Sequence, residues 1–269
     1  MVAASRYLLL GFATCTLGMA QSTPETALAD APFQKEQGWR PLLNGRDLSG
    51  WHSLAGWRGD PKRLNEWITT PAVALSDKSA DLLVAKPGVG NAIVNGIATH
   101  TSNLVTDESF GDVELYLEFM VSKGSNSGVY LHGLYEVQIF DSWGAGSALK
   151  SGDAGGIYER WRDNKGFEGS APRVNASRAP GEWQSYHIWF QAPRFEKGRK
   201  VSEAEFLKVV YNGVLVQANY RCTGPTRSGL EIPEASQNPI MLQGDHGPVA
   251  FRNIYLRPLR RHGSGAGSN

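Results

Sequence analysis

The chain has few cysteines and almost no net charge, and these shortages exclude several classes of protein. Only two of its 269 residues are cysteines, Cys15 and Cys222, so the fold cannot depend on a disulfide framework. The formal net charge is +1, and no long basic block is present beyond the short cluster at 260–262. We therefore expect no nucleic-acid partner.

The chain also lacks an apolar run long enough to cross a membrane. The run that follows Arg6 near the N-terminus is shorter than the roughly 18 residues of a span. A basic residue, a short apolar stretch and small residues near Ala20 are typical of an export signal. We expect residues 1–20 to be a signal peptide and the protein to be periplasmic or secreted. Lipidation of Cys15 is a weaker alternative, because the residues before it depart from the usual pattern.

Helical periodicity is scarce, whereas short apolar runs alternate with turn residues throughout the chain. An Asn-Gly pair at 212–213 lies between two such runs, which is a strong hairpin signal. With 31 glycines and 14 prolines, this pattern favours a β-sandwich or jelly roll. The expected strands are 112–121, 128–133, 136–140, 183–190, 206–211, 214–220, 239–242 and 249–256.

Composition divides the chain into one domain and its flanks. Residues 21–38 are polar, small and alanine-rich, which is typical of a flexible linker. The jelly-roll domain is expected to span residues 39–260. The last residues, 261–269, have the Gly/Ser composition of a flexible tail.

The richest segment, residues 125–143, predicts a β-hairpin with an apolar face and a polar face, because the two kinds of residue alternate. A two-residue loop would set Leu131 opposite Glu136 and mix apolar with charged side chains. We therefore expect a three-residue loop at 133–135 that pairs His132 with Glu136.

The polar face of this hairpin supplies the main site candidates. Glu136 is the first candidate for a catalytic acid or base, because a mid-strand carboxylate is costly unless it faces a polar cleft. His132 is the second, since its pKa suits a proton relay, with a plain surface histidine as the alternative. Tyr130 and Gln138 would offer hydroxyl and amide groups to a ligand, and Trp143 would either stack on that ligand or lie in the core.

Two later loops supply further candidates for substrate binding. The glycine-rich loop after the hairpin would bring backbone close to a ligand, with Asp153 and Arg160 at its rim, unless it is an ordinary surface loop. Gln243 and His246 lie between two expected strands. Arg252, in the second of these strands, either reaches the cleft or forms a structural ion pair.

No local cluster of cysteine, histidine or acidic residues has the spacing of a zinc or calcium site. Residues from distant loops could still hold a divalent metal ion. The combination to consider is His132, Glu136 and His246.

Five segments together resemble one family of bacterial exported proteins, the 3-keto-disaccharide hydrolases. Their order and spacing carry the resemblance, which spans roughly residues 39–259. The stretch 58–106 fits less well and is expected to carry an insertion. The matching segments are 41–51, 125–143, 179–184, 211–213 and 247–254.

The resemblance implies an all-β fold, a concanavalin A-like jelly-roll β-sandwich of two antiparallel sheets. It also implies cleavage of 3-keto-glycosides or 3-keto-disaccharides, whose sugar a separate 3-oxidoreductase must oxidise first. A ketone at carbon 3 acidifies the hydrogen at carbon 2. Elimination of the aglycone followed by water addition therefore becomes accessible to a base that acts beside a stabilised enolate. Hydrolysis without elimination is the alternative.

The Glu-x-Asp-x-x-Glu strand of retaining glucanases is missing. Glu114 and Glu118 share a strand face without the middle aspartate, and we expect that face to be exposed. Two other functions compete with the enzyme. One is a noncatalytic carbohydrate-binding jelly roll with a shallow groove. The other is a ligand-free surface module in which Glu136 and His132 face solvent.

Overall fold

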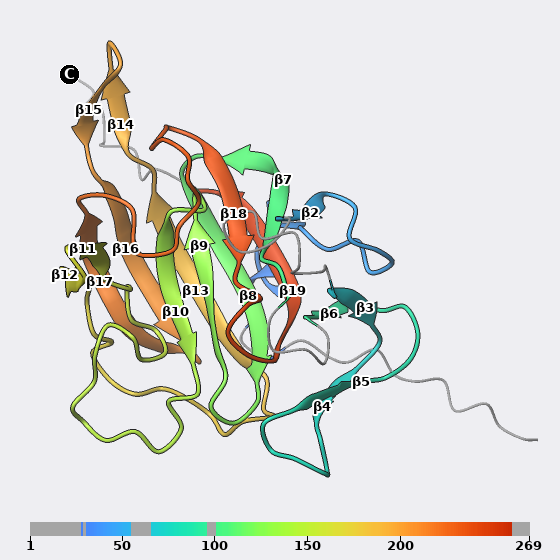
Figure 1. The fold of residues 1–269 in the computed structure, drawn as a ribbon. Coiled ribbons are helices and arrows are strands. Elements are labelled where there is room, and N and C mark those ends of the chain that lie inside the picture. The colour runs from blue at the N-terminus through green and yellow to red at the C-terminus, as the bar shows by residue number, and fades with distance from the viewer. Residues whose placement is uncertain (1–27, 29–30, 55–65, 96–100, 260–269) are drawn as a thin grey trace, which may run out of the picture.

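A computed structural model describes residue 28 and residues 31–54, 66–95 and 101–259, and Figure 1 shows it as a ribbon. The regular structure of these residues is β, apart from one short 3-10 helix, η1 (Pro32–Gln34). The expected signal peptide and C-terminal tail lie outside the described residues. Within the described part, no helix has the length and apolarity that crossing a membrane requires.

The strands form a β-sandwich of two antiparallel sheets, which confirms the predicted fold class. The larger sheet has eight strands and the smaller has five. The larger contains β17 (Val214–Cys222), β16 (Ala204–Tyr211), β13 (Gln184–Gln191), β8 (Val113–Val121), β19 (Val249–Pro258), β6 (Ala92–Val94) and β3 (Ile68–Thr70) in this order, with β1 (Arg40–Pro41) paired to β19. The smaller contains β10 (Tyr135–Phe140), β9 (Asn126–Leu131), β18 (Asn238–Leu242), β7 (Leu104–Phe110) and β2 (Trp51–Ser53).

Side chains from the two inner faces meet in one apolar core. Along β13 buried and partly exposed residues alternate, as expected for a strand with one face in the core. Large rings such as Phe119 and Phe190 from the larger sheet pack with Val129 and Val137 from the smaller one. All eight strands predicted from the sequence are present, and the Asn212-Gly213 pair forms the turn between β16 and β17 with positive φ at both residues.

In the described residues, three two-stranded hairpins stand apart from the main sheets. They are β4 (Val73–Leu75) with β5 (Leu83–Ala85), β11 (Arg160–Arg162) with β12 (Lys165–Phe167), and β14 (Arg194–Glu196) with β15 (Arg199–Ser202). The β4–β5 hairpin packs apolar side chains against the outer side of the larger sheet, where Met120 and Ala250 lie. The larger sheet is therefore covered on both faces there.

The outer face of β8 is buried, so the expectation of an exposed face for Glu114 and Glu118 is wrong. Glu118 pairs with Arg252 at 2.6 Å, and Glu114 pairs with Arg257 at 2.6 Å. Burial alone would raise the pKa of Glu114, but hydrogen bonds from His187 and Arg257 outweigh it and lower this pKa. Two charged residues on one strand face are thus neutralised by arginines of β19.

The N-terminal segment that was expected to be a linker covers this face. In its described part, the ring of Phe33 stacks on Tyr255 with centroids 3.8 Å apart. Glu36 forms an ion pair with Arg257 at 2.6 Å, and the amide of Leu28 donates to Glu118 at 2.9 Å. Residues 31–37 therefore belong to the packed structure.

Candidate functional site

The β9–β10 hairpin turns one residue earlier than the sequence predicts. Glu136 pairs with Tyr130, so the predicted pairing with His132 is wrong. His132 and Gly133 have φ values of 57° and 64°. Two successive residues with positive φ are typical of a type I′ turn, in which glycine is strongly favoured, and this turn sets the register. Because the strand partners shift by two positions, the residues within the paired strands stay on the faces predicted for them.

The turn carries His132 away from the polar face and into the interior. Its side chain is buried, its ring lies 5.1 Å from that of Phe190, and its Nε2 is 3.3 Å from the carbonyl oxygen of Gly111. Burial lowers the pKa of His132, although the hydrogen bond to Gly111 opposes this. The imidazole that was expected beside Glu136 is thus a neutral group packed among aromatic rings.

The other polar residues of the hairpin do converge. Tyr130, Glu136 and Gln138 lie on the outward face of the five-stranded sheet, opposite the apolar residues of β9 and β10. They line a cavity of about 190 Å³. Loops supply its remaining walls, with Asn126, Tyr158, Arg227, Ser228, Gln243 and His246.

Glu136 is the most perturbed acidic group of this cavity. Its side chain is 2% exposed, and burial raises its pKa from 4.5 to about 8, against the hydrogen bond from Tyr130 and together with the charge of Asp245. The carboxyl occupies space left by Gly128, where an added Cβ would lie 2.1 Å from Oε1 of Glu136. At neutral pH this residue is therefore a largely protonated acid in a fitted position.

The neighbouring polar groups are partly satisfied within the protein. Burial raises the pKa of Tyr130 well above 10, so its hydroxyl stays a donor, and it lies 3.4 Å from the carbonyl oxygen of Arg227. Gln138 donates from Nε2 to Asn126 at 2.9 Å. The side-chain oxygen of Gln243 is buried and has no hydrogen-bond partner among the described residues, so it is an open acceptor at the cavity.

His246 brings a second titratable group to the cavity. Its Nδ1 lies 2.6 Å from Oδ1 of Asp245, whose side chain is 1% exposed, whereas the side chain of His246 is 46% exposed. A carboxylate on one ring nitrogen fixes the tautomer and leaves the other nitrogen as a proton acceptor. The cavity thus combines a neutral carboxyl group with an oriented imidazole.

The glycine-rich loop after β10 runs along the free edge of that strand. Backbone groups of residues 155–158 form hydrogen bonds with those of Glu136 and Gln138, which protects the edge and brings Tyr158 to the cavity. Asp153 is not among the residues that line the cavity. Its carboxylate accepts a hydrogen bond from the amide of Lys150 at 2.7 Å. The loop therefore reaches the cavity through Tyr158 and not through the predicted Asp153.

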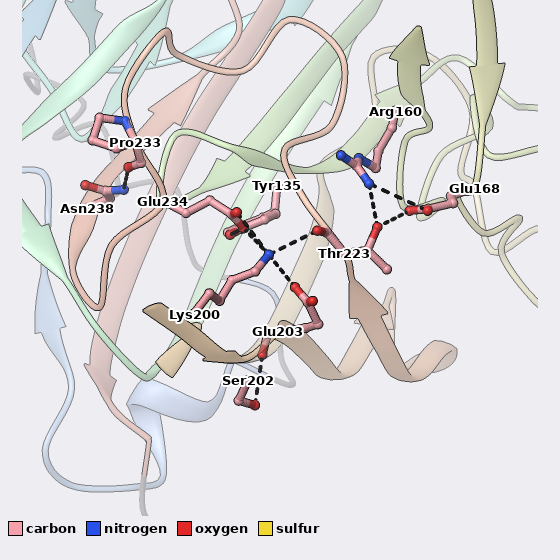
Figure 2. A network of polar contacts seen from close by, with 10 residues as sticks. All are labelled: Tyr135, Arg160, Glu168, Lys200, Ser202, Glu203, Thr223, Pro233, Glu234 and Asn238. Carbon is pink, nitrogen blue, oxygen red and sulfur yellow. Dashed lines mark hydrogen bonds and ion pairs between the residues drawn. The ribbon is translucent and has the colours of Figure 1, made fainter. Parts of the chain in front are cut away.

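Three further predicted residues lie outside the cavity lining. Trp143 follows β10 and is 60% exposed. Arg160 contacts Thr223 at 2.6 Å and Glu168 at 3.6 Å in the network of Figure 2. Arg252 forms its ion pair with Glu118 on the larger sheet, so its structural alternative is correct. Neither Arg160 nor Arg252 is therefore among the residues that line the cavity.

Arg227 and Ser228 were missed by sequence reasoning, although a signal was present. They lie between Pro225 and Gly229, a spacing typical of a loop, and Ser228 has a positive φ of 63°. The loop is fastened to the hairpin, because the amide of Thr226 donates to the carbonyl of Leu134 at 2.9 Å. Tertiary contacts of this kind, which the local sequence does not reveal, bring the loop to the cavity.

A second hollow, of about 290 Å³, lies beside β1, β2 and β7 and is larger than the cavity at Glu136. Its charged groups are exposed and paired, as in the contact of Arg40 with Glu108 at 2.6 Å. Because it holds no buried titratable group, the smaller cavity is the better candidate for chemistry.

The metal set considered from the sequence is not brought together. His132 is remote from the cavity that Glu136 and His246 share. Across the described ranges of the chain, no three or more histidine, cysteine or acidic side chains are arranged to hold a metal ion.

Comparisons with known proteins give a family match and similar solved structures. The family profile described as "3-keto-alpha-glucoside-1,2-lyase-like domain" matches residues 38–257. A solved candidate glycosyl hydrolase from Parabacteroides distasonis ATCC 8503 is similar, with 28% identity, a TM-score of 0.57, and coverage of 83% of this chain and 84% of that one. Another from the same organism has 15% identity, a TM-score of 0.49 and coverage of 83% and 95%. No curated protein matches the chain.

Proposed function

The chain belongs to the family of 3-keto-alpha-glucoside-1,2-lyase-like domains, and from that premise we propose that it cleaves 3-keto-glycosides by elimination. At the coarser level it is a carbohydrate-active domain of the glycosyl hydrolase or lyase type. One observation supports the proposed cleavage of 3-keto-glycosides. The same cavity holds Glu136, a neutral carboxyl group, and His246, whose ring is oriented by Asp245.

The proposed reaction assigns one proton transfer to each group. The ring nitrogen of His246 that faces away from Asp245 takes the proton from carbon 2. The electron pair of the broken C–H bond then forms the enolate of the 3-ketone. As the enolate collapses, the bond from carbon 1 to the glycosidic oxygen breaks and a C1–C2 double bond forms. Glu136 gives its proton to the departing oxygen. Water then adds across the double bond and yields the free 3-keto sugar.

The cavity favours an enzyme over a binding module. A noncatalytic jelly roll needs a groove with aromatic rings and few perturbed acids, whereas here the pKa of a fully buried carboxyl group is raised to about 8. The ligand-free module would leave Glu136 and His132 in solvent, but both are buried.

The proposed substrate contacts come from the amide groups. Gln243 offers an unpaired buried acceptor to a sugar hydroxyl, and the amides of Asn126 and Gln138 offer N–H donors to the ketone or a hydroxyl. A volume of about 190 Å³ is below the roughly 300–1,000 Å³ of drug-sized pockets. One sugar ring would therefore enter, and the aglycone would stay at the rim.

The test compares a chromogenic 3-keto-glucoside with its unoxidised parent. We expect release of the aglycone from the keto sugar alone, incorporation of solvent deuterium at carbon 2, and transient absorbance of the unsaturated ketone. Glu136→Gln should lower kcat by about 10²–10⁴-fold, the usual contribution of a general acid. Glu196→Gln, an exposed carboxylate on β14, is the matched control.

Cleavage of both substrates at similar rates would refute the elimination, and an unchanged rate in Glu136→Gln would refute the proposed acid. Arms with and without a chelator test for a divalent metal ion. We also propose that the protein is exported and acts on the product of a separate sugar 3-oxidoreductase. Cell fractionation and N-terminal sequencing of the mature chain test the former, and reconstitution of the two steps with an unoxidised glycoside tests the latter.

A further inference from the structure

Arg227 is the cation of the candidate cavity, and its guanidinium group is stacked rather than paired. It lies 3.9 Å from the ring centroid of Trp161, which is 41% exposed on the β11–β12 hairpin. Among the described residues no carboxylate lies within ion-pair distance of Arg227. Stacking on an indole uses the flat face of a guanidinium and leaves its N–H edge free to bind.

The two other arginines that the sequence proposed for substrate binding have carboxylate partners. Arg160 contacts Glu168, and Arg252 contacts Glu118. Arg227 lines the cavity beside Glu136 without such a partner. The difference marks this side chain as one whose hydrogen-bond donors are open to a ligand.

The loop that carries Arg227 is held at both ends by one lysine. In Figure 2 the amino group of Lys200 lies between Thr223 and Glu234, the two ends of the segment 223–234. Its Nζ donates to the carbonyl oxygen of Thr223 at 3.0 Å and to the carboxylate of Glu234 at 3.0 Å. In the middle of the loop, the amide of Arg227 donates to the carbonyl oxygen of Glu159 at 2.9 Å. The position of the guanidinium is therefore largely set before any ligand binds.

The unpaired N–H edge of Arg227 favours an anionic ligand. Glu136, with a pKa of about 8, is mostly neutral at pH 7, and the carboxylate of Asp245 lies 2.6 Å from the ring of His246. Among the described residues, neither carboxyl group forms an ion pair with Arg227. A carboxylate matches the two parallel N–H groups of a guanidinium better than a hydroxyl does.

We propose that Arg227, oriented by Trp161, binds a carboxylate group of the substrate, so that the cavity prefers sugar acids or glycosides with an acidic aglycone over neutral ones. The inference rests on the proposed function only in taking a carbohydrate as the ligand, and it narrows the substrate class. Arg227 is the specificity residue, and Trp161 is a positioning residue.

The test measures binding of glucuronate and of glucose to the whole chain by ligand-detected NMR and calorimetry. The wild-type protein should bind glucuronate about tenfold or more tightly than glucose, as expected for one charge-assisted contact. Arg227→Gln should abolish this preference and leave glucose binding unchanged. Arg162→Gln is the matched control, because Arg162 is an exposed arginine that lies next to Trp161 on the β11–β12 hairpin and does not line the cavity.

Trp161 is tested through the same preference. Trp161→Leu should reduce the preference for glucuronate, whereas Trp161→Phe should retain it, because an aromatic ring is needed to stack on the guanidinium group. A purely structural role would instead change the binding of both sugars together. The preference should also weaken as the salt concentration rises.

Equal binding of both sugars by the wild-type protein, no detectable binding of glucuronate, or a parallel loss for both sugars in Arg227→Gln would overturn the anion site. These outcomes are separate from the proposed reaction. If cleavage of a 3-keto-glucoside persists without a preference for acids, only the anion site fails. If glucuronate is preferred but no 3-keto sugar is cleaved, only the reaction fails.

Discussion

Replacing Glu136 with glutamine should stabilise the protein, and the gain should depend on pH. In the folded chain burial raises the pKa of this carboxyl group to about 8, against 4.5 for an exposed group. Between these values the unfolded chain loses the proton while the folded chain keeps it. The folded state therefore binds more protons, and the stability of the wild-type protein falls as pH rises from about 4.5 to about 8.

The size of the effect follows from the shift. One pKa unit corresponds to about 1.4 kcal/mol, so the rise from 4.5 to about 8 corresponds to about 5 kcal/mol above pH 8. At pH 7 the expected difference between Glu136→Gln and the wild type is about 3 kcal/mol on the same scale. Below pH 4 both side chains are neutral, and the pH-dependent difference should vanish.

Urea unfolding of both proteins at unit steps from pH 4 to pH 9 measures this difference directly. The gap should grow by about 1.4 kcal/mol per pH unit and level off near pH 8. The exposed Glu196→Gln variant should show no such growth. The difference in the free energy of unfolding could instead stay constant across the range, or the wild type could become the more stable of the two as pH rises. Either result would show that Glu136 is ionised in the folded protein, and Glu136 could not then act as the acid of the proposed reaction.

Three further substitutions test the geometry. Gly128→Ala would place a Cβ against the carboxyl group of Glu136, so we expect at least about a tenfold loss of kcat and a cost of about 1–3 kcal/mol, measured by kinetics and urea unfolding. Glu118→Gln leaves Arg252 in a broken buried ion pair and should cost about 3–5 kcal/mol, while an added Arg252→Met should recover part of this loss. His132→Asn, which tolerates positive φ, should keep kcat within about twofold, and a loss as large as that of Glu136→Gln would restore a catalytic role to this histidine.

Local patterns were sufficient for the strands and for the faces of the central hairpin. Alternation assigned Tyr130, Glu136 and Gln138 to one face, and the structure agrees because the pairing differs from the predicted one by two positions. The turn itself was misplaced, since a histidine with positive φ is uncommon and the sequence pattern favoured the next residues. His132 left the polar face for that reason.

Contacts between distant segments were beyond the reach of local patterns. Arg252 and Glu118 are far apart in sequence, and their ion pair depends on the register of β19 against β8. Arg227 reaches the cavity because its loop is fastened to Lys200 and to the hairpin. Because pairings between distant segments build this site, only some of its residues could be predicted from the sequence.

Three carboxyl groups of the described sheets are almost fully buried, and the contrast among them supports a function for one. Glu114 and Glu118 each face an arginine at 2.6 Å, which is the structural way to bury a negative charge. Glu136 has no such cation as a partner; its neighbours are a tyrosine hydroxyl and the charge of Asp245, and its pKa rises to about 8. Glu136, which has no cationic partner, therefore lowers the stability of the folded protein at neutral pH, as expected for a residue kept for function. The increase in stability expected for Glu136→Gln measures this cost.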